Sequence, residues 1–198
     1  MNKTIIACSL ALISVCVQAA DDHATQVMKA SFKERGQAKL DRLEQDETMA
    51  LCTKYAAAKV PKNVAKKIES LNLKTVKWPA DGKLLGDWKE GEKIAQTGVG
   101  KQFSDNPANP SGGKCYACHQ LSPQELSYGN IGPILYNYGK ARGNSKEIQK
   151  YTYGKVYNSE AYAACSSMPR FGHNGILTEK QMQDVTALLL DPDSPVNK

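Results

Sequence analysis

The chain has 198 residues, of which 26 are Lys or Arg and 20 are Asp or Glu, giving a formal net charge of +6. Hydrophobic residues make up 41% of it, which is enough to bury a core, and no long apolar run follows the N-terminal stretch. The basic residues are spread out, which argues against a nucleic-acid-binding protein, and nothing in the mature chain predicts a membrane span. The positive charge either is simply solvated or steers acidic electron-transfer partners.

The first twenty residues have the pattern of a secretory signal peptide. Lys3 supplies the positive charge, residues 5–17 are apolar but too few to cross a membrane, and small residues precede the cleavage site. The residues ending in Cys8 resemble a lipoprotein signal, but the apolar region before that cysteine would be too short. We therefore expect export to the periplasm, with cleavage after Ala19 or Ala20.

Residues 21–59 show apolar residues mostly three or four apart, which predicts an amphipathic helix that Gly36 interrupts. A further helical segment follows Pro61, and residues 78–82 are rich in turn formers. The predicted organisation is therefore a signal peptide at residues 1–20, a helical N-terminal extension at residues 21–80 and a main domain at residues 81–198.

The main domain shows helix signals and no strong strand signals. Asp87 is a good N-cap for a helix that runs to about Thr97, and residues 146–157 form a short helical pattern. The segment from Thr178 to Gln181 has a capping-box pattern that begins a last helix, which ends before Pro192. Long loops join these helices, so the pattern predicts an all-α domain whose core includes a cofactor.

The strongest chemical signal is the segment Cys115-Tyr116-Ala117-Cys118-His119. Two thiols three residues apart can each bond one haem vinyl group, and the adjacent His119 can then ligate the iron. A zinc site needs about four ligands, and no second Cys/His pair occurs. A disulfide oxidoreductase would need a strand before the motif, where this chain has Ser and Gly. We therefore expect one covalently bound haem c, attached through Cys115 and Cys118.

Two further positions complete this expected site. The carbonyl of Pro133 is placed to accept a hydrogen bond from the second ring nitrogen of His119. Met168 lies in a loop shaped by Pro and Gly and is the expected sixth ligand, because a thioether raises the haem potential. His173 is the competing ligand, whereas Met182 belongs to the apolar face of the last helix.

Cys52 and Cys165 are the remaining cysteines of the mature chain. An exported protein meets an oxidising compartment, so we expect a disulfide between them. A mixed disulfide with a partner and a reactive Cys165 are the alternatives.

The haem motif, Gly132-Pro133, the Met168 to Gly172 segment and the Gly175 to Thr178 segment together resemble the SoxX family, over about residues 86–198. Members are the small mono-haem subunits of the bacterial thiosulfate-oxidising SoxAX complex. The resemblance implies a class I cytochrome c-like all-α domain with a helical N-terminal extension. It also implies haem on Cys115 and Cys118, and iron ligation by His119 and Met168.

The function implied by the resemblance is electron transfer as the haem subunit of an L-cysteine S-thiosulfotransferase. Such a subunit pairs with a larger, SoxA-like haem cytochrome, takes the electrons released when thiosulfate is coupled to a carrier-protein cysteine, and passes them to a downstream acceptor protein. The reactive cysteine belongs to the larger subunit, so no catalytic residue is expected here. A free diffusible cytochrome c and a small haem peroxidase are the alternatives, and a Met-ligated iron argues against the peroxidase.

The apolar residues of the extension also predict a partner surface. They exceed what a domain of about a hundred residues needs for its own core. We expect Arg170, Lys114 and Lys140 at the rim of that surface, where charge tunes the encounter with acidic groups.

Overall fold

The computed structural model describes residues 23–198, so the predicted signal peptide at residues 1–20 lies outside the described residues. Contacts divide the chain into two compact units, residues 1–44 and residues 45–198. In the described part of the first unit, residues 23–31 are helical and a 3-10 helix, η1, spans Leu40–Leu43. Between them Arg35 and Ala38 form an isolated β-bridge around Gly36, whose φ is 54°.

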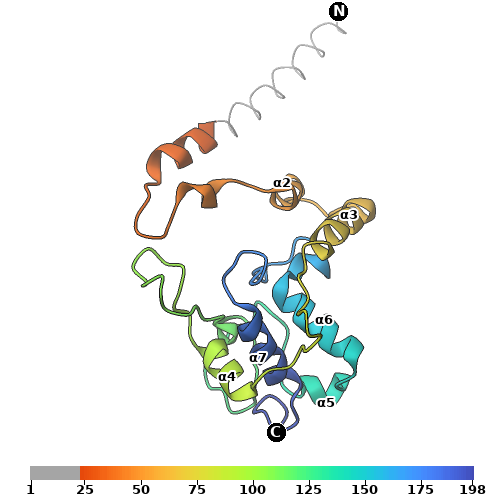
Figure 1. The fold of residues 1–198 in the computed structure, drawn as a ribbon. Helices are drawn as coiled ribbons and strands as arrows, with labels where there is room; N and C mark the ends of the chain where they lie inside the picture. Colours follow the sequence, from red (N-terminus) through yellow and green to blue (C-terminus); the bar gives the residue numbers. More distant parts are fainter. Residues whose placement is uncertain (1–22) are drawn as a thin grey trace, which may run out of the picture. The chain divides into compact units, whose positions relative to one another are not determined.

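The second unit consists of helices joined by long connections (Figure 1). Its α-helices are α2 (Glu47–Lys54), α3 (Lys62–Leu73), α4 (Trp88–Gln96), α5 (Tyr138–Arg142), α6 (Lys146–Tyr157) and α7 (Glu179–Leu190). Two 3-10 helices accompany them, η2 (Cys115–Ala117) and η3 (Ser159–Ala161).

The helix starts of the main unit follow the N-cap signals in the sequence. The Asp87 carboxylate accepts a hydrogen bond from the Lys89 amide at the start of α4. At α7 the Thr178 hydroxyl and the Gln181 side chain form a complete capping box, and the helix ends at Leu190, directly before Asp191 and Pro192. The predictions of helices beginning at these two caps are therefore confirmed.

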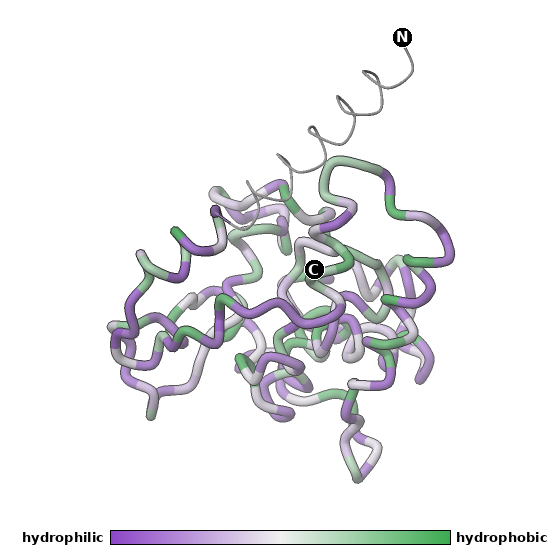
Figure 2. The backbone as a smooth tube through the Cα atoms, turned by 90° about the horizontal axis from the view of Figure 1, so that it is seen from above, coloured by the Kyte–Doolittle hydropathy of each residue, from purple (hydrophilic) through white to green (hydrophobic). Residues whose placement is uncertain are grey.

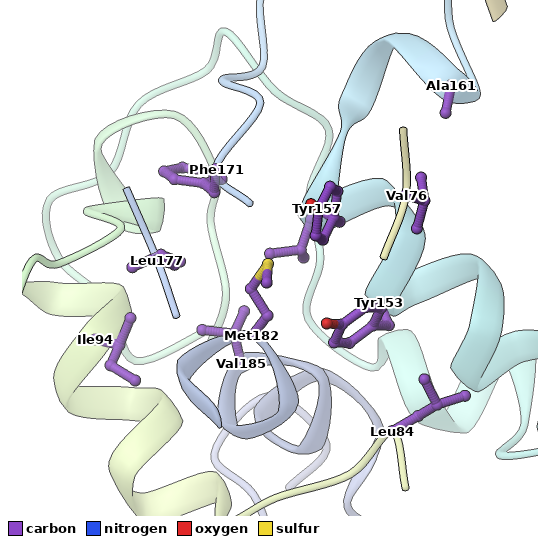
Figure 3. Packing of buried hydrophobic residues seen from close by; sticks show 11 residues of the cluster. Val76, Leu84, Ile94, Tyr153, Tyr157, Ala161, Phe171, Leu177, Met182 and Val185 are labelled. Carbon is purple, nitrogen blue, oxygen red and sulfur yellow. The ribbon is translucent and has the colours of Figure 1, made fainter. Parts of the chain in front are cut away.

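The core forms where α7 packs against α4 and α6. Met182 and Val185 of α7 extend toward side chains of α4, α6 and the loop before α7 (Figure 3). Gly91 allows the close approach of α4, because a Cβ at this position would overlap the Asp184 carbonyl of α7. The members of this cluster are Val76, Leu84, Ile94, Tyr153, Val156, Tyr157, Ala161, Phe171, Leu177, Met182 and Val185.

A second cluster joins α7 to the segment that contains the cysteine motif. Leu188 and Leu189 pack there with Tyr116 of η2 and with Leu121 shortly after it. Leu188 and Leu121 are almost completely inaccessible to solvent. The segment around Cys115 is therefore anchored to the last helix by apolar packing.

The fold class expected from the sequence, a class I cytochrome c-like domain with a helical N-terminal extension, has to be corrected. Residues 23–198 contain no group of three or more His, Cys, Asp or Glu side chains that could hold a metal ion. Residues 45–80 are not a separate extension, because they belong to the same compact unit as residues 81–198. The described chain is a helical unit at residues 45–198 preceded by residues 23–44, and it contains no named strand.

The helix predicted over residues 21–59 is also wrong as a single or once-interrupted element. The chain turns at Gly36, forms only the short η1, and starts α2 at a new N-cap, Asp46. Apolar spacing alone did not show that residues such as Phe32 and Leu40 stay exposed. Figure 2 shows hydrophobic and hydrophilic residues interspersed along the described chain. None of the helices in residues 23–198 has both the length and the apolar character that a membrane span requires.

Candidate functional site

A cavity of about 420 Å³ lies in the second unit and collects the residues that the sequence singled out. Cys115, Cys118 and His119 line it together with Pro133 and Met168. Most of the remaining lining is apolar, from residues such as Ile131, Leu135, Val156, Phe171 and Leu189. A hollow of this size with a few convergent polar groups has the character of a ligand site.

The cysteine motif enters this cavity through a tight turn. Lys114 adopts a left-handed conformation with φ 44° and leads into η2. The amides of Cys118 and His119 both donate to the Cys115 carbonyl, at 3.1 and 2.9 Å. The turn brings both thiols to the same cavity without bonding them to each other. Burial, the larger cause, together with the nearby Cys118 and Glu92, raises the pKa of the Cys115 thiol to about 12.

His119 is held in one orientation by the segment that follows. Its Nδ1 lies 2.7 Å from the Pro133 carbonyl oxygen, as predicted from the sequence. A Cβ on residue 132 would overlap the imidazole ring, so Gly132 lets the ring lie directly against the backbone. With Nδ1 donating to this carbonyl, Nε2 is the nitrogen with a free lone pair, which is the state needed to ligate a metal.

Met168 lies in the wall of the same cavity and packs against the core cluster around α7. Its backbone is bonded on both sides. The Ser159 hydroxyl donates to the Met168 carbonyl at 2.5 Å, and the Met168 amide donates to the Ser166 hydroxyl at 3.2 Å. The structure thus brings Met168 into one cavity with His119.

His173, the competing ligand in the sequence, is directed elsewhere. It is not among the residues that line the cavity. Its Nδ1 lies 3.2 Å from the Thr75 hydroxyl, and its Nε2 lies 4.0 Å from the Asp46 carboxylate. Burial and the neighbouring Arg170 lower the pKa of His173 below its ordinary value of 6.5, and Asp46 opposes this shift. His173 therefore belongs to a polar cluster with residues that precede the main domain.

The structure contains the disulfide between Cys52 and Cys165, with Cα atoms 5.4 Å apart. It links α2 to the segment directly before Met168, across 113 positions of sequence. Cys165 has a φ of 58°, the left-handed region that residues with a side chain rarely adopt. The Glu160 carboxylate accepts a hydrogen bond from the Cys165 amide at 2.6 Å and stabilises this turn.

The sequence predicts Arg170 at a solvent-exposed rim, and this prediction is wrong. Its side chain is only 10% exposed and forms an ion pair with Asp46, Nη1 to Oδ2, at 2.7 Å. Lys114 and Lys140 are exposed. The local sequence does not indicate this burial, because the carboxylate that neutralises Arg170 lies 124 positions earlier in the chain.

Sequence reasoning named Lys114 but missed two other cationic residues that line the cavity. Arg142 of α5 and Lys155 of α6 both line it. The Arg142 guanidinium lies over the rings of Tyr138 and Tyr151, at 5.1 and 5.6 Å from their centroids. Burial lowers the pKa of the Lys155 amine, which donates to the Ser159 carbonyl at 3.0 Å. The available signal was the group of Arg, Lys and Tyr residues at helical spacing between Tyr138 and Lys155.

Comparison with known proteins places the chain in a family without assigning an activity. No model of a known protein family matches it. A protein of Aquifex aeolicus (strain VF5), named "Uncharacterized lipoprotein", is 35% identical over 208 aligned positions, which cover 100% of this chain and 95% of that protein. The chain therefore belongs to the family of this Aquifex aeolicus lipoprotein.

Proposed function

We propose that this protein carries one haem c, attached through Cys115 and Cys118, and that its function is electron transfer. The observation that supports this most is the cavity in which both free thiols, His119 and Met168 meet. The contact between His119 Nδ1 and the Pro133 carbonyl adds to it, because iron-ligating histidines are held by such second partners.

The remaining lining also fits a haem group. The apolar side chains suit a flat hydrophobic ring, and Arg142 and Lys155 supply positive charge for the two carboxylates that a haem bears. His119 and Met168 would ligate its iron. A bound haem supplies a one-electron couple, whose potential a His and Met ligand pair raises. The protein's part is to hold these two side chains and to keep water away from them.

The resemblance to the SoxX family gives this proposal a biological setting. In this setting the chain is the electron-transferring haem subunit of an L-cysteine S-thiosulfotransferase, and no residue of the chain is itself catalytic. Its partners are a larger, SoxA-like haem cytochrome and a downstream electron acceptor. Exposed apolar side chains at the cavity support protein docking: Ile131, which lines it, is 73% exposed, and Ile134, between the lining residues Pro133 and Leu135, is 59% exposed.

We also infer that the mature protein works in the periplasm. The N-terminal signal pattern and the disulfide between Cys52 and Cys165 both support an oxidising compartment outside the cytoplasm. The name of the Aquifex relative raises a second possibility, which is that a lipid anchors this chain to a membrane after export.

The haem proposal is tested by mass spectrometry of mature protein made in a host that matures c-type cytochromes. The expected mass is that of the polypeptide plus one haem, and the haem should resist extraction with acidified acetone. A Cys115→Ala, Cys118→Ala double variant is the control and should lack haem. A wild-type protein without covalent haem would reject the proposal.

The complex is tested separately, by purifying the untagged native protein and identifying what stays bound. Co-purification with a larger haem cytochrome supports the thiosulfate-oxidising complex. A haem-loaded protein that never binds such a cytochrome favours the free diffusible carrier.

A further inference from the structure

The helix α2, outside the cavity, contacts both ends of the loop that carries Met168. We call residues 165–171 the Met168 loop. At its start, Cys165 is bonded to Cys52 near the end of α2. At its other end, Arg170 forms the ion pair with Asp46, which is the N-cap of α2. One helix of eight residues therefore holds the loop from both sides.

The Asp46 carboxylate has two tasks at once. Oδ1 accepts a hydrogen bond from the Met49 amide at 2.8 Å, which caps α2, and Oδ2 pairs with Arg170 at 2.7 Å. Burial by itself raises the pKa of Asp46, but the Met49 amide and Arg170 outweigh this and the pKa lies below its ordinary value of 3.8. The carboxylate is thus ionised at neutral pH and neutralises the buried charge of Arg170.

The position of α2 is itself set by a buried hydrogen-bonded chain. The Asn72 amide group of α3 donates to the Thr48 hydroxyl of α2 at 2.8 Å. The Asn158 amide group donates to the Asn72 side-chain oxygen at 2.9 Å, and Asn158 caps η3, where Ser159 bonds the Met168 carbonyl. The contacts run from α2 through α3 and η3 back to the Met168 loop and form a closed circuit.

We propose that α2 is a clasp for the Met168 loop and that Asp46 is a positioning residue, which acts through Arg170 to keep the Met168 thioether directed into the cavity. The inference rests on the proposed function, since it assigns the clasp to an iron ligand. A helix that merely stabilised the fold would have no need to contact this loop at both ends. Asp46 does not line the cavity, so its effect there is indirect.

The test uses the mature full-length protein with the substitution Asp46→Asn. Asn is as good an N-cap as Asp, so α2 keeps its start while Arg170 loses its counter-charge. The matched control is Glu47→Gln, which removes the neighbouring carboxylate, whose ion pair with Lys67 at 2.6 Å lies on the surface. Surface pairs of this kind contribute little.

Two measurements are made on each variant. The first is hydrogen–deuterium exchange of the amides in the Met168 loop, where we expect about tenfold faster exchange in Asp46→Asn and none of this change in Glu47→Gln. The second is the weak near-infrared-edge absorption of Met–iron ligation in the ferric protein, together with the reduction potential. Both should fall in Asp46→Asn, and the Arg170→Gln variant should show the same losses, with no further loss in the double variant.

The outcomes separate the clasp from the haem proposal. If the wild type binds no haem, the proposed function fails. The inference as stated then fails too, because it assigns the clasp to an iron ligand. Faster loop exchange in Asp46→Asn would in that case show only that α2 holds the loop. If the wild type shows Met–iron absorption and Asp46→Asn leaves both that absorption and the loop exchange unchanged, the haem proposal stands and the clasp is rejected. A general loss of stability with no selective effect on the loop rejects it as well.

Discussion

The Nδ1 atom of His119 lies 2.7 Å from the carbonyl oxygen of Pro133. Gly132, directly before Pro133, has no room for a side chain beside the imidazole. We predict that Gly132→Ala displaces the ring or the Pro133 carbonyl and destabilises the site by about 1–3 kcal/mol, as overpacking does elsewhere. Covalent haem should still form on the two cysteines, but the ferric spectrum should change. An unchanged ferric spectrum in Gly132→Ala would contradict the prediction.

Replacing Met168 and replacing His173 should have different effects on the iron spectrum, because Met168 is the proposed sixth ligand and His173 is not. Because Met168 lines the cavity and His173 points to Thr75 and Asp46, Met168→Ala should abolish the Met–iron absorption and lower the reduction potential. His173→Ala should leave the absorption in place. Optical titration of both variants measures this. A spectrum lost in His173→Ala and kept in Met168→Ala would make His173 the ligand.

The cysteine motif and its Pro133 partner could be predicted from the sequence because their chemistry is local. A motif such as Cys115 to His119 contains its own spacing, and the carbonyl of Pro133 follows close enough for the chain to return. Helix starts at Asp87 and Thr178 were predictable for the same reason, since an N-cap acts on amides two or three residues away.

Contacts between distant segments were not predictable in the same way. Asp46 pairs with Arg170 although nothing near either residue in sequence indicates the other. Apolar spacing over residues 21–59 likewise predicted helix on both sides of Gly36, because it does not show that the chain beyond this residue forms only η1 before α2 begins after Asp46. The merging of residues 45–80 with the main unit depends on long-range pairs of this kind.

The bond between Cys52 and Cys165 closes a loop with a sequence separation of 113. In the chain-entropy model a loop of this size restricts the unfolded state enough to stabilise the folded protein by about 5 kcal/mol. The Cys52→Ala, Cys165→Ala double variant should therefore unfold at much lower urea concentration than wild type. Urea unfolding followed by circular dichroism measures the difference. A loss below about 1 kcal/mol would show that tertiary contacts alone hold α2 in place.

Deletion of residues 21–80 should disturb the proposed haem site itself. Such a deletion takes away Asp46 and Cys52 and leaves Arg170 buried without its partner. The Met168 loop should then loosen. The truncated protein should therefore lose Met–iron absorption in addition to any loss of affinity for a partner. Deletion of residues 21–44 keeps the second unit complete and should preserve the spectrum, which is measured on both proteins side by side.

The ion pair between Asp46 and Arg170 gives a pH dependence with a definite sign. Because the pKa of Asp46 lies below 3.8 in the folded protein, its ionised form favours folding. This contribution is present in full above the unfolded value and is lost as the pH falls through the folded pKa. His173 also faces this carboxylate, so both proteins are compared in a His173→Ala background. There the stability difference that Asp46→Asn causes should be constant between about pH 5 and 7 and shrink below about pH 3.5. Urea unfolding at these pH values tests it, and a difference that grows on acidification would contradict it.

The N-terminus of the mature chain distinguishes simple secretion from lipid anchoring. Cleavage after Ala19 or Ala20 removes both Cys8 and Cys16, leaving no thiol for acylation near the new N-terminus. Lipid attachment at Cys8 would instead keep the apolar residues 9–17 in the exported chain, where water would surround them unless a membrane took them up. We therefore predict an unmodified N-terminus at Ala20 or Asp21, measured by mass spectrometry of the N-terminal peptide, and release of the protein with the periplasmic fraction. Cys8→Ser and Cys16→Ser should leave both results unchanged. A diacylated N-terminal cysteine, lost in one of these two variants along with membrane association, would show that the chain shares the lipid anchor implied by its relative's name.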